Sequence, residues 1–225
     1  MNPLKVSFLI VVISILFVTA CSTTQQAYIR NVEMYFESDT AVNLSTEEIR
    51  QSAADLIYVK NGERSQVTMA LAFIENEQYK WVSRDGVMFI TENGRLVRTL
   101  NLDKNLLYVS HLSLDPLALP SFYDKDLQWD RVIDTQHGEY GVNVSSSTSV
   151  LINHLVDIQD AQLMTKKYLE TVHYNSQKHG KHTWINTFWF DQSSGQLLKS
   201  SQKMSPHSDA IEITYISRAL RLLEK

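Results

Sequence analysis

The stretch VMFITENGRLVRTL, residues 87–100, decides the fold of this chain. Within it, Asn93 and Gly94 stand between two apolar runs, Val87–Ile90 and Leu96–Leu100. Asn-Gly in that position is the strongest short-range signal of a β-hairpin, because both residues accept the positive φ angles of a tight turn. The stretch therefore predicts two antiparallel strands.

Further short apolar runs extend this pattern along the chain on both sides of the hairpin. Several of these runs are apolar on both faces, which predicts a sheet that wraps around itself or is covered. The fold class we expect is mainly β, with one large antiparallel sheet, curved or barrel-like, and an N-terminal helical segment. We expect the other strands at residues 55–60, 67–74, 79–82, 128–135, 141–149, 162–174, 183–191, 196–203 and 211–216.

Helical signals are concentrated near the N-terminus. The apolar residues of the segment 28–36 have helical spacing. Ser45 and Glu48 have the spacing of a capping box, which predicts a short helix that runs to about Ser52. Two prolines, Pro116 and Pro120, indicate that residues 101–127 are irregular, and the pattern over 218–223 is too short to assign.

The first residues resemble a bacterial lipoprotein signal. One early charge, Lys5, precedes an apolar run that is short for a membrane span. The run ends in Val18-Thr19-Ala20-Cys21, which resembles a lipobox. We therefore expect a signal peptide over 1–20, lipid on Cys21, a tether over 21–27 and a single domain over 28–225. The alternative is an uncleaved signal anchor.

Cys21 is the only cysteine of the chain. A lipidated thiol explains this odd count, and the domain must then hold together by core burial without a disulfide. Lipoproteins retained in the inner membrane often carry Asp after the cysteine, so Ser22 favours the outer membrane, with the domain facing the periplasm. The net charge of −4 and the lack of a basic run make nucleic acid an unexpected partner.

Three groups of polar residues could form a functional site, and each also has a plainer interpretation. The first, His173, His179 and His182, suggests a metal site, but a solvated hairpin tip explains it, and we expect no metal or cofactor.

The second group suggests glycoside hydrolysis, but a solvated loop explains it. Its members are Asp115, Asp124, Asp126 and Asp130. The third group, Ser145–Ser149, is rich in hydroxyls and suggests a nucleophile, but it has no nucleophile elbow, and a solvent-facing strand explains it.

Tryptophans are the candidate contact residues for a glycan or a protein partner. Alternation along the strand 183–190 places Trp184, Asn186, Phe188 and Phe190 on one face, which has the character of a core. Trp189 then lies on the opposite face. Trp189 and Trp81 are our candidates for glycan or partner contact, although core packing is the more common role of tryptophan.

Taken in order behind the lipobox, several blocks of the chain resemble the GfcB/YjbF family of group 4 capsule and exopolysaccharide lipoproteins. The resemblance implies a large antiparallel β fold and a role beside other periplasmic and outer-membrane proteins that secrete or assemble polysaccharide. It carries over no catalytic residue. The blocks are Leu44–Ile49, Asp55–Val59, Lys80–Asp85, Asn93–Thr99, Asn186–Asp191, Ser194–Gln196 and Ser200–Gln202.

The function we expect is therefore that of a non-enzymatic accessory lipoprotein in capsule or exopolysaccharide export or assembly. Two alternatives stay open: a periplasmic enzyme that modifies the polysaccharide, and a structural envelope lipoprotein unrelated to glycan. A cleft with two facing carboxylates would favour the enzyme. A broad apolar or aromatic patch on a closed sheet would favour the accessory factor.

Overall fold

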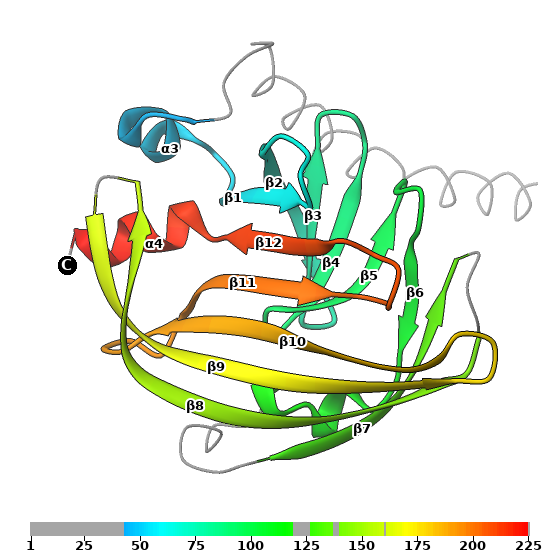
Figure 1. Ribbon diagram of the computed structural model, residues 1–225. Coiled ribbons are helices and arrows are strands. Elements are labelled where there is room, and N and C mark those ends of the chain that lie inside the picture. Colours follow the sequence, from blue (N-terminus) through cyan, green and yellow to red (C-terminus); the bar gives the residue numbers. More distant parts are fainter. Residues whose placement is uncertain (1–42, 119–126, 137–139, 160, 225) are drawn as a thin grey trace, which may run out of the picture. The chain divides into compact units, whose positions relative to one another are not determined.

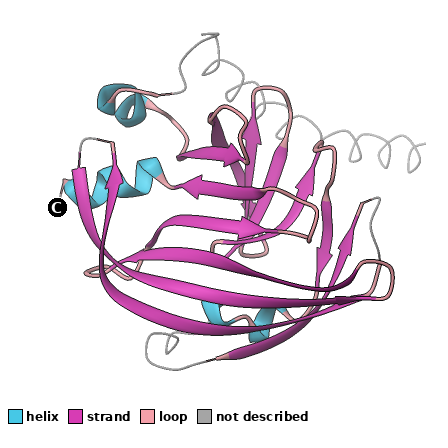
Figure 2. Cartoon of the chain, in the orientation of Figure 1, coloured by secondary structure: helices cyan, strands magenta, loops and turns pink. Residues whose placement is uncertain are grey.

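Strands make up most of the chain in the computed structural model, which describes residues 43–118, 127–136, 140–159 and 161–224 (Figures 1 and 2). The strands are β1 (Leu56–Asn61), β2 (Val67–Glu75), β3 (Gln78–Ser83), β4 (Met88–Glu92), β5 (Arg95–Leu100), β6 (Leu106–Val109), β7 (Gln128–Thr135), β8 (Val142–Ile158), β9 (Ala161–Ser176), β10 (Gly180–Asp191), β11 (Leu197–Lys203) and β12 (Ala210–Thr214).

The described strands form one 12-stranded sheet in the order β5-β4-β3-β2-β1-β12-β11-β10-β9-β8-β7-β6. Every pairing in it is antiparallel. Apart from the β1–β12 pair, each strand pairs with a strand that precedes or follows it along the chain. The predicted fold class, a large antiparallel and curved sheet, is confirmed.

The sheet nearly closes on itself along a seam, where the edge strands β5 and β6 meet. Thr99 of β5 supplies the contact, because its hydroxyl accepts a hydrogen bond from the backbone N–H of Leu106 in β6 at 2.9 Å. The same hydroxyl donates to the side-chain oxygen of Asn105 at 3.1 Å. Closure in this way covers edges that would otherwise present unpaired backbone groups.

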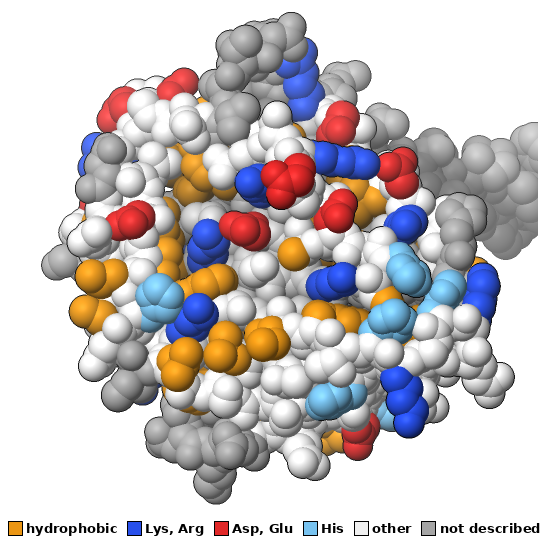
Figure 3. Space-filling model, in the orientation of Figure 1, with side chains coloured by type: hydrophobic (Ala, Val, Ile, Leu, Met, Phe, Trp, Pro, Cys, Tyr) orange, Lys and Arg blue, Asp and Glu red, His pale blue; other side chains and the backbone are white. Residues whose placement is uncertain are grey.

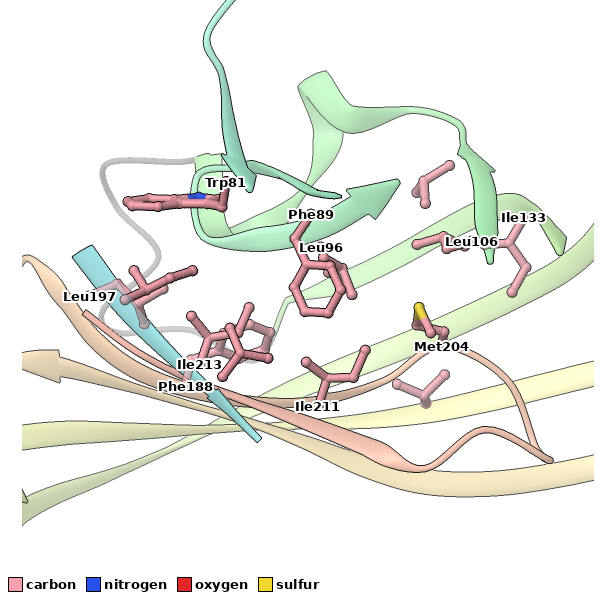
Figure 4. Packing of buried hydrophobic residues seen from close by; sticks show 14 of the residues in the cluster. Trp81, Phe89, Leu96, Leu106, Ile133, Phe188, Leu197, Met204, Ile211 and Ile213 are labelled. Atoms are coloured by element: carbon pink, nitrogen blue, oxygen red, sulfur yellow. The ribbon is translucent and has the colours of Figure 1, made fainter. Parts of the chain in front are cut away.

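The interior of the curved sheet is filled by inward-facing apolar side chains from both halves of the chain (Figure 4). Trp81 and Phe89 come from the first half, and Phe188, Ile211 and Ile213 come from the second. None of these five is more than 2% exposed. Apolar burial of this kind stabilises the fold by about 25 cal/mol for each Å² removed from water.

The Asn93–Gly94 turn joins β4 to β5 as the sequence predicts. Both residues have positive φ, at 50° and 84°. Gly94 also packs closely against β11: a Cβ built there would lie 2.1 Å from Cδ2 of Leu197, so that the buried Leu197 side chain would have to shift. The turn therefore combines a backbone requirement with close approach to β11.

Helices occupy two places in the described residues. The capping box at Ser45 is confirmed, and it opens α3 (Thr46–Gln51): the backbone N–H of Ser45 donates to Glu48 at 2.7 Å. The unassigned C-terminal stretch forms α4 (Ile216–Leu223), whose apolar face is buried against the body. The helix predicted over 28–36 lies outside the described residues. Neither described helix combines the length and the apolar character that a membrane span needs.

The prediction that residues 101–127 are irregular is wrong in part. The segment contains β6 and two 3-10 turns, η1 (Leu112–Leu114) and η2 (Pro116–Ala118). Strand β6 is four residues long and lies at the edge of the sheet, so it carries too little alternation to be recognised. Strand β8 is longer than predicted, because it continues past a bulge near Asn153, which has a φ of 59°. Strand β9 extends one residue earlier and two residues later than predicted.

Candidate functional site

Four charged side chains meet inside the curved sheet, and we call them the interior charge cluster: Arg95, Asp115, Arg131 and Glu170. Arg95, on β5, donates to both carboxylate oxygens of Asp115 and to Glu170 at 2.9 Å. Arg131, on β7, lies 3.3 Å from the other oxygen of Glu170. All four residues are less than 9% exposed, and their formal charges sum to zero.

The electrostatics of this cluster keep Glu170, Arg95 and Arg131 ionised at neutral pH. Burial by itself raises the pKa of Glu170, but the charges of Arg95 and Arg131 outweigh that effect and lower the pKa to about 2. Burial also favours neutral Arg95, yet Asp115 and Glu170 raise its pKa overall. Burial lowers the pKa of Arg131 to about 10, and repulsion by Arg95 contributes.

Neutral polar groups and an aromatic ring complete the surroundings of the interior charge cluster. Asn186 on β10 donates to Glu170 at 2.9 Å, and Arg131 donates to the hydroxyl of Ser146 at 3.0 Å. The Trp129 ring contacts both guanidinium groups, with its centroid 4.4 Å from Cζ of Arg95 and 4.2 Å from Cζ of Arg131. Such cation–π contacts strengthen when they are removed from water.

The interior charge cluster is built to hold the sheet closed. It joins β5, on one side of the seam, to β7 and β9, on the other side. The adjoining cavity measures about 30 Å³, which is about the volume of one water molecule. A sugar ring does not fit there, and Glu170 is ionised at neutral pH, whereas a general acid for glycoside hydrolysis is protonated.

Trp189 lies on the outer face of the sheet, on the side of β10 that alternation predicts, whereas Asn186, Phe188 and Phe190 are buried inside. Its ring is half-buried between the strand neighbours Lys167 and Lys199, whose ammonium groups lie 5.3 and 5.6 Å from the ring centroid. The His154 ring packs edge-on at 6.4 Å.

Apolar side chains continue from Trp189 toward the β8–β9 turn, and we call Leu151, Leu155, Met164 and Trp189 the outer-face patch. Leu151 and Leu155 are 50% exposed, and Met164 is 42% exposed. Strand pairing brings them together. Leu155 pairs with Met164, and Leu151 pairs with Lys167, which in turn pairs with Trp189. Figure 3 shows hydrophobic side chains gathered with basic and histidine side chains on this face. Large exposed apolar groups of this kind mark interaction surfaces.

The other end of β9 carries a cavity of about 210 Å³, which we call the histidine pocket. Its walls include Lys104, Tyr174, His179, His207 and the loop between β11 and β12. The His207 ring lies 5.1 Å from that of His179 and 5.7 Å from that of His182. Mouths of curved sheets such as this one are common ligand sites.

The histidines singled out in the sequence do not converge as a triad. His173 lies on the outer face, hydrogen-bonded to Thr183, because it alternates with the buried Tyr174. His207, from a distant loop, takes the third place instead. Within the described residues, no three His, Cys, Asp or Glu side chains are arranged to hold a metal ion.

Trp81 and Asp115 do not have the surroundings that the sequence suggests. Trp81 is 2% exposed, and its indole N–H donates to Thr91 at 3.0 Å, so the proposed glycan or partner contact at Trp81 is wrong. Asp115 is buried in the interior charge cluster and is not solvated, because Arg95 compensates its charge. Asp130 is exposed, as predicted, whereas Asp124, Asp126 and Cys21 lie outside the described residues.

The serine-rich run alternates, and only part of it faces solvent. Ser145 and Ser149 are exposed, whereas Ser146 and Thr148 are buried. Reasoning from the sequence missed Arg95, Arg131, Glu170 and His207. The sequence contains a signal for two of them. Arg131 lies on the same strand face as Trp129 and Ile133, and Glu170 lies on the same face as Tyr168 and Val172. A charge at an inward position of an alternating strand requires a buried partner.

Comparison with known proteins places these features in a group of lipoproteins. The family model described as group 4 capsule polysaccharide lipoprotein gfcB, YjbF, matches residues 29–216. The chain is 27% identical to the uncharacterized lipoprotein GfcB of Escherichia coli K12, over 94% of this chain and 98% of that protein. It is 26% identical to the uncharacterized lipoprotein YjbF of the same strain, over 91% and 94%.

A solved structure has a similar fold. The crystal structure of the hypothetical lipoprotein YmcC from Escherichia coli K12 matches with a TM-score of 0.69 and 28% sequence identity. The match covers 77% of this chain and 88% of that one.

Proposed function

This chain belongs to the YjbF family of group 4 capsule polysaccharide lipoproteins, and from that premise we propose that it is an outer-membrane, non-enzymatic accessory factor in export or assembly of the polysaccharide. In this role the domain faces the periplasm and acts through contacts with other secretion proteins. Lipid on Cys21 holds it at the membrane, and the residue that follows, Ser22, favours the outer membrane.

The observation that carries this proposal is the outer-face patch on a sheet that is otherwise nearly closed. Trp and Met are enriched in the cores of protein interfaces, and the patch combines Trp189 and Met164 with two leucines. Lys167 and Lys199 already occupy positions beside the Trp189 ring. The aliphatic part of the patch favours a protein partner over a glycan, since sugars stack on aromatic faces.

The patch ends close to the first residues that the structure describes. The backbone N–H of Leu44 donates to the hydroxyl of Tyr58 at 2.6 Å. Gln159, beside the β8–β9 turn, donates to the same hydroxyl at 3.3 Å. The described chain therefore begins close to the turn that ends the patch.

The interior charge cluster supports a role without catalysis. Its two carboxylates, Asp115 and Glu170, face each other across Arg95 and are both ion-paired with it. In the closed structure they contact side chains of the domain itself. Their role is to stabilise the fold, which leaves the surface as the functional part.

Deletion of the gene followed by complementation tests the proposal. Wild-type protein should restore surface polysaccharide to the deletion strain, whereas Cys21→Ala, which removes the lipid, should restore much less at equal protein level. Ser22→Asp should shift the protein to the inner membrane in a density gradient and should also fail to restore. Normal surface polysaccharide in the deletion strain would overturn the proposed process.

Two outcomes of the same experiment would support the alternatives. Full rescue by Cys21→Ala would contradict the need for an anchor. Polysaccharide that is exported in normal amount but with altered chain length or substitution would point to an enzyme that modifies it.

A further inference from the structure

The histidine pocket is formed by five separate parts of the chain at one end of the curved sheet. These are the loop before β6, the end of β7, the end of β9, the β9–β10 turn and the β11–β12 loop. The β11–β12 loop is held in shape by Ser208, whose hydroxyl accepts from the backbone N–H groups of Met204 and Ser205 at 3.1 and 3.0 Å. The pocket is therefore supported on several sides.

The walls of the histidine pocket contain cationic and neutral polar groups but no carboxylate among the described residues. Lys104 and His207 lie close together, since the ammonium group of Lys104 donates to the carbonyl oxygen of His207 at 3.2 Å. Asn105, Thr135 and Gln136 add neutral polar groups, while Tyr174 and Met204 supply an apolar floor. A polar rim with an apolar floor suits a sugar ring, and the positive charge suits an acid.

Nearby carboxylates belong to an adjoining cavity of about 170 Å³, which shares Lys104 and His207 with the histidine pocket. Asp103 there is paired with Arg64 at 2.9 Å. Asp209 lies beside Gly62, where a Cβ would approach its side chain to 2.8 Å. Among the described residues, the carboxylates therefore line the second cavity, whereas the histidine pocket is lined by Lys104, His179 and His207.

The histidines of the pocket repel one another when they are protonated. Burial lowers the pKa of His207, and so do its basic neighbours His179, His182, Lys104 and Lys203. Nε2 of His182 lies 2.7 Å from the carbonyl oxygen of His179 and donates to it. An anion placed between these groups would relieve the repulsion, so that its binding would be coupled to proton uptake.

We propose that the histidine pocket binds the carboxylate of an acidic sugar, a uronic acid unit of the polysaccharide. This inference rests on the proposed function for the source of the sugar. The cavity of about 210 Å³ is smaller than the roughly 300–1,000 Å³ of pockets for drug-sized ligands, and it suits one sugar ring. Because the pocket and the outer-face patch lie at opposite ends of β9, one domain can bind glycan and a protein partner together.

Titration of the full-length mature protein with glucuronate, followed by NMR of the histidine side chains, tests this proposal. Glucuronate should shift the imidazole signals of His207 and His179, and glucose at the same concentration should leave them unchanged. Affinity should rise as the pH falls from 7.5 to 5.5, by up to about tenfold for each unit by which binding raises the pKa of His207.

Matched variants separate the pocket from other effects. His207→Asn should lose most of the binding of glucuronate and the pH dependence of that binding. Lys104→Gln should also lose most of the affinity for glucuronate. His173→Asn, which removes an exposed histidine of the outer face, should bind as wild type does. Equal binding of inorganic phosphate and glucuronate would overturn the assignment to a sugar, and unchanged binding by His207→Asn would overturn the site.

The two proposals fail in different ways. If glucuronate does not bind while the deletion strain lacks surface polysaccharide, the pocket assignment is wrong and the proposed function stands. If glucuronate binds while the deletion strain makes normal polysaccharide, the proposed function is wrong and the pocket remains an acidic-sugar site.

Discussion

At the scale of single residues, Glu170 is the centre of the molecule's interior. It is 1% exposed, contacts both buried arginines and accepts a hydrogen bond from Asn186. Buried ion pairs contribute little net stability compared with apolar packing, but removal of one partner leaves an uncompensated charge. The stability of the fold should therefore be sensitive to substitution of Glu170.

Glu170→Gln should lower the free energy of unfolding by about 3–5 kcal/mol, because two guanidinium groups would then share only Asp115 as a counter-charge. Chemical denaturation measures this change. The control is Glu212→Gln, which removes the half-exposed partner of Lys199 and should cost less than about 1 kcal/mol. Equal losses in the two variants would contradict the stated role of Glu170.

Acid should unfold the protein partly through the same residue. The pKa of Glu170 is lowered from 4.5 to about 2 in the folded state, so the folded state favours the ionised form. The resulting stabilisation is complete above the unfolded pKa and is lost as the pH falls from about 4.5 toward 2. Denaturation curves across this range should show a steeper loss for wild type than for Glu170→Gln.

Alternation predicted which way the side chains of β10 point, and it therefore placed Trp189 correctly on the outer face. It did not predict the partners of inward charges. Asp115 lies in a loop whose sequence suggests solvent, and only the fold brings Arg95 to it from a strand 20 residues earlier. Pairings of this kind depend on strand order, which the sequence pattern leaves open.

At the scale of elements, the β4–β5 turn shows how one local signal is reinforced by tertiary packing. Asn-Gly predicts the hairpin through backbone conformation alone. In the structure Gly94 also packs against Leu197 of β11, so both the backbone conformation and the tertiary contact favour glycine at this position.

Gly94→Ala should therefore destabilise the protein by more than the roughly 1–2 kcal/mol that a left-handed conformation costs a residue with a Cβ. The extra loss comes from the contact of 2.1 Å that the new Cβ would make with Leu197. Gly180→Ala is the control, since Gly180 also has positive φ, at 76°, but has nothing within 4 Å of the added atom. Urea denaturation should show the larger loss at Gly94, and equal losses would contradict the packing role.

Long alternating segments were the most predictable elements, and β7 matches its predicted bounds. The short edge strand β6 was missed because four residues carry little periodicity. The second half of β8 was also hidden, since a bulge at Asn153 shifts the register without a glycine or proline to mark it.

At the scale of the whole molecule, a curved sheet without a disulfide is closed by a seam and by the interior charge cluster. The sequence predicted the fold class, but it did not predict that β5 and β6, neighbours along the chain, would be the two edges of the sheet. Closure removes most of the edge surface, and the two contact sites that we propose are the outer-face patch and the histidine pocket at the open end.

We propose that the outer-face patch is the surface through which this lipoprotein acts in export or assembly of the polysaccharide. The test is the amount of surface polysaccharide in the deletion strain that carries the double variant Leu155→Glu and Met164→Glu. Its control is the double variant Ile74→Glu and Leu114→Glu, two leucine-sized positions that are 54% and 63% exposed and lie outside the patch. At equal protein levels, we expect the patch variant to restore little polysaccharide and the control to restore the wild-type amount. Full restoration by the patch variant would contradict the account.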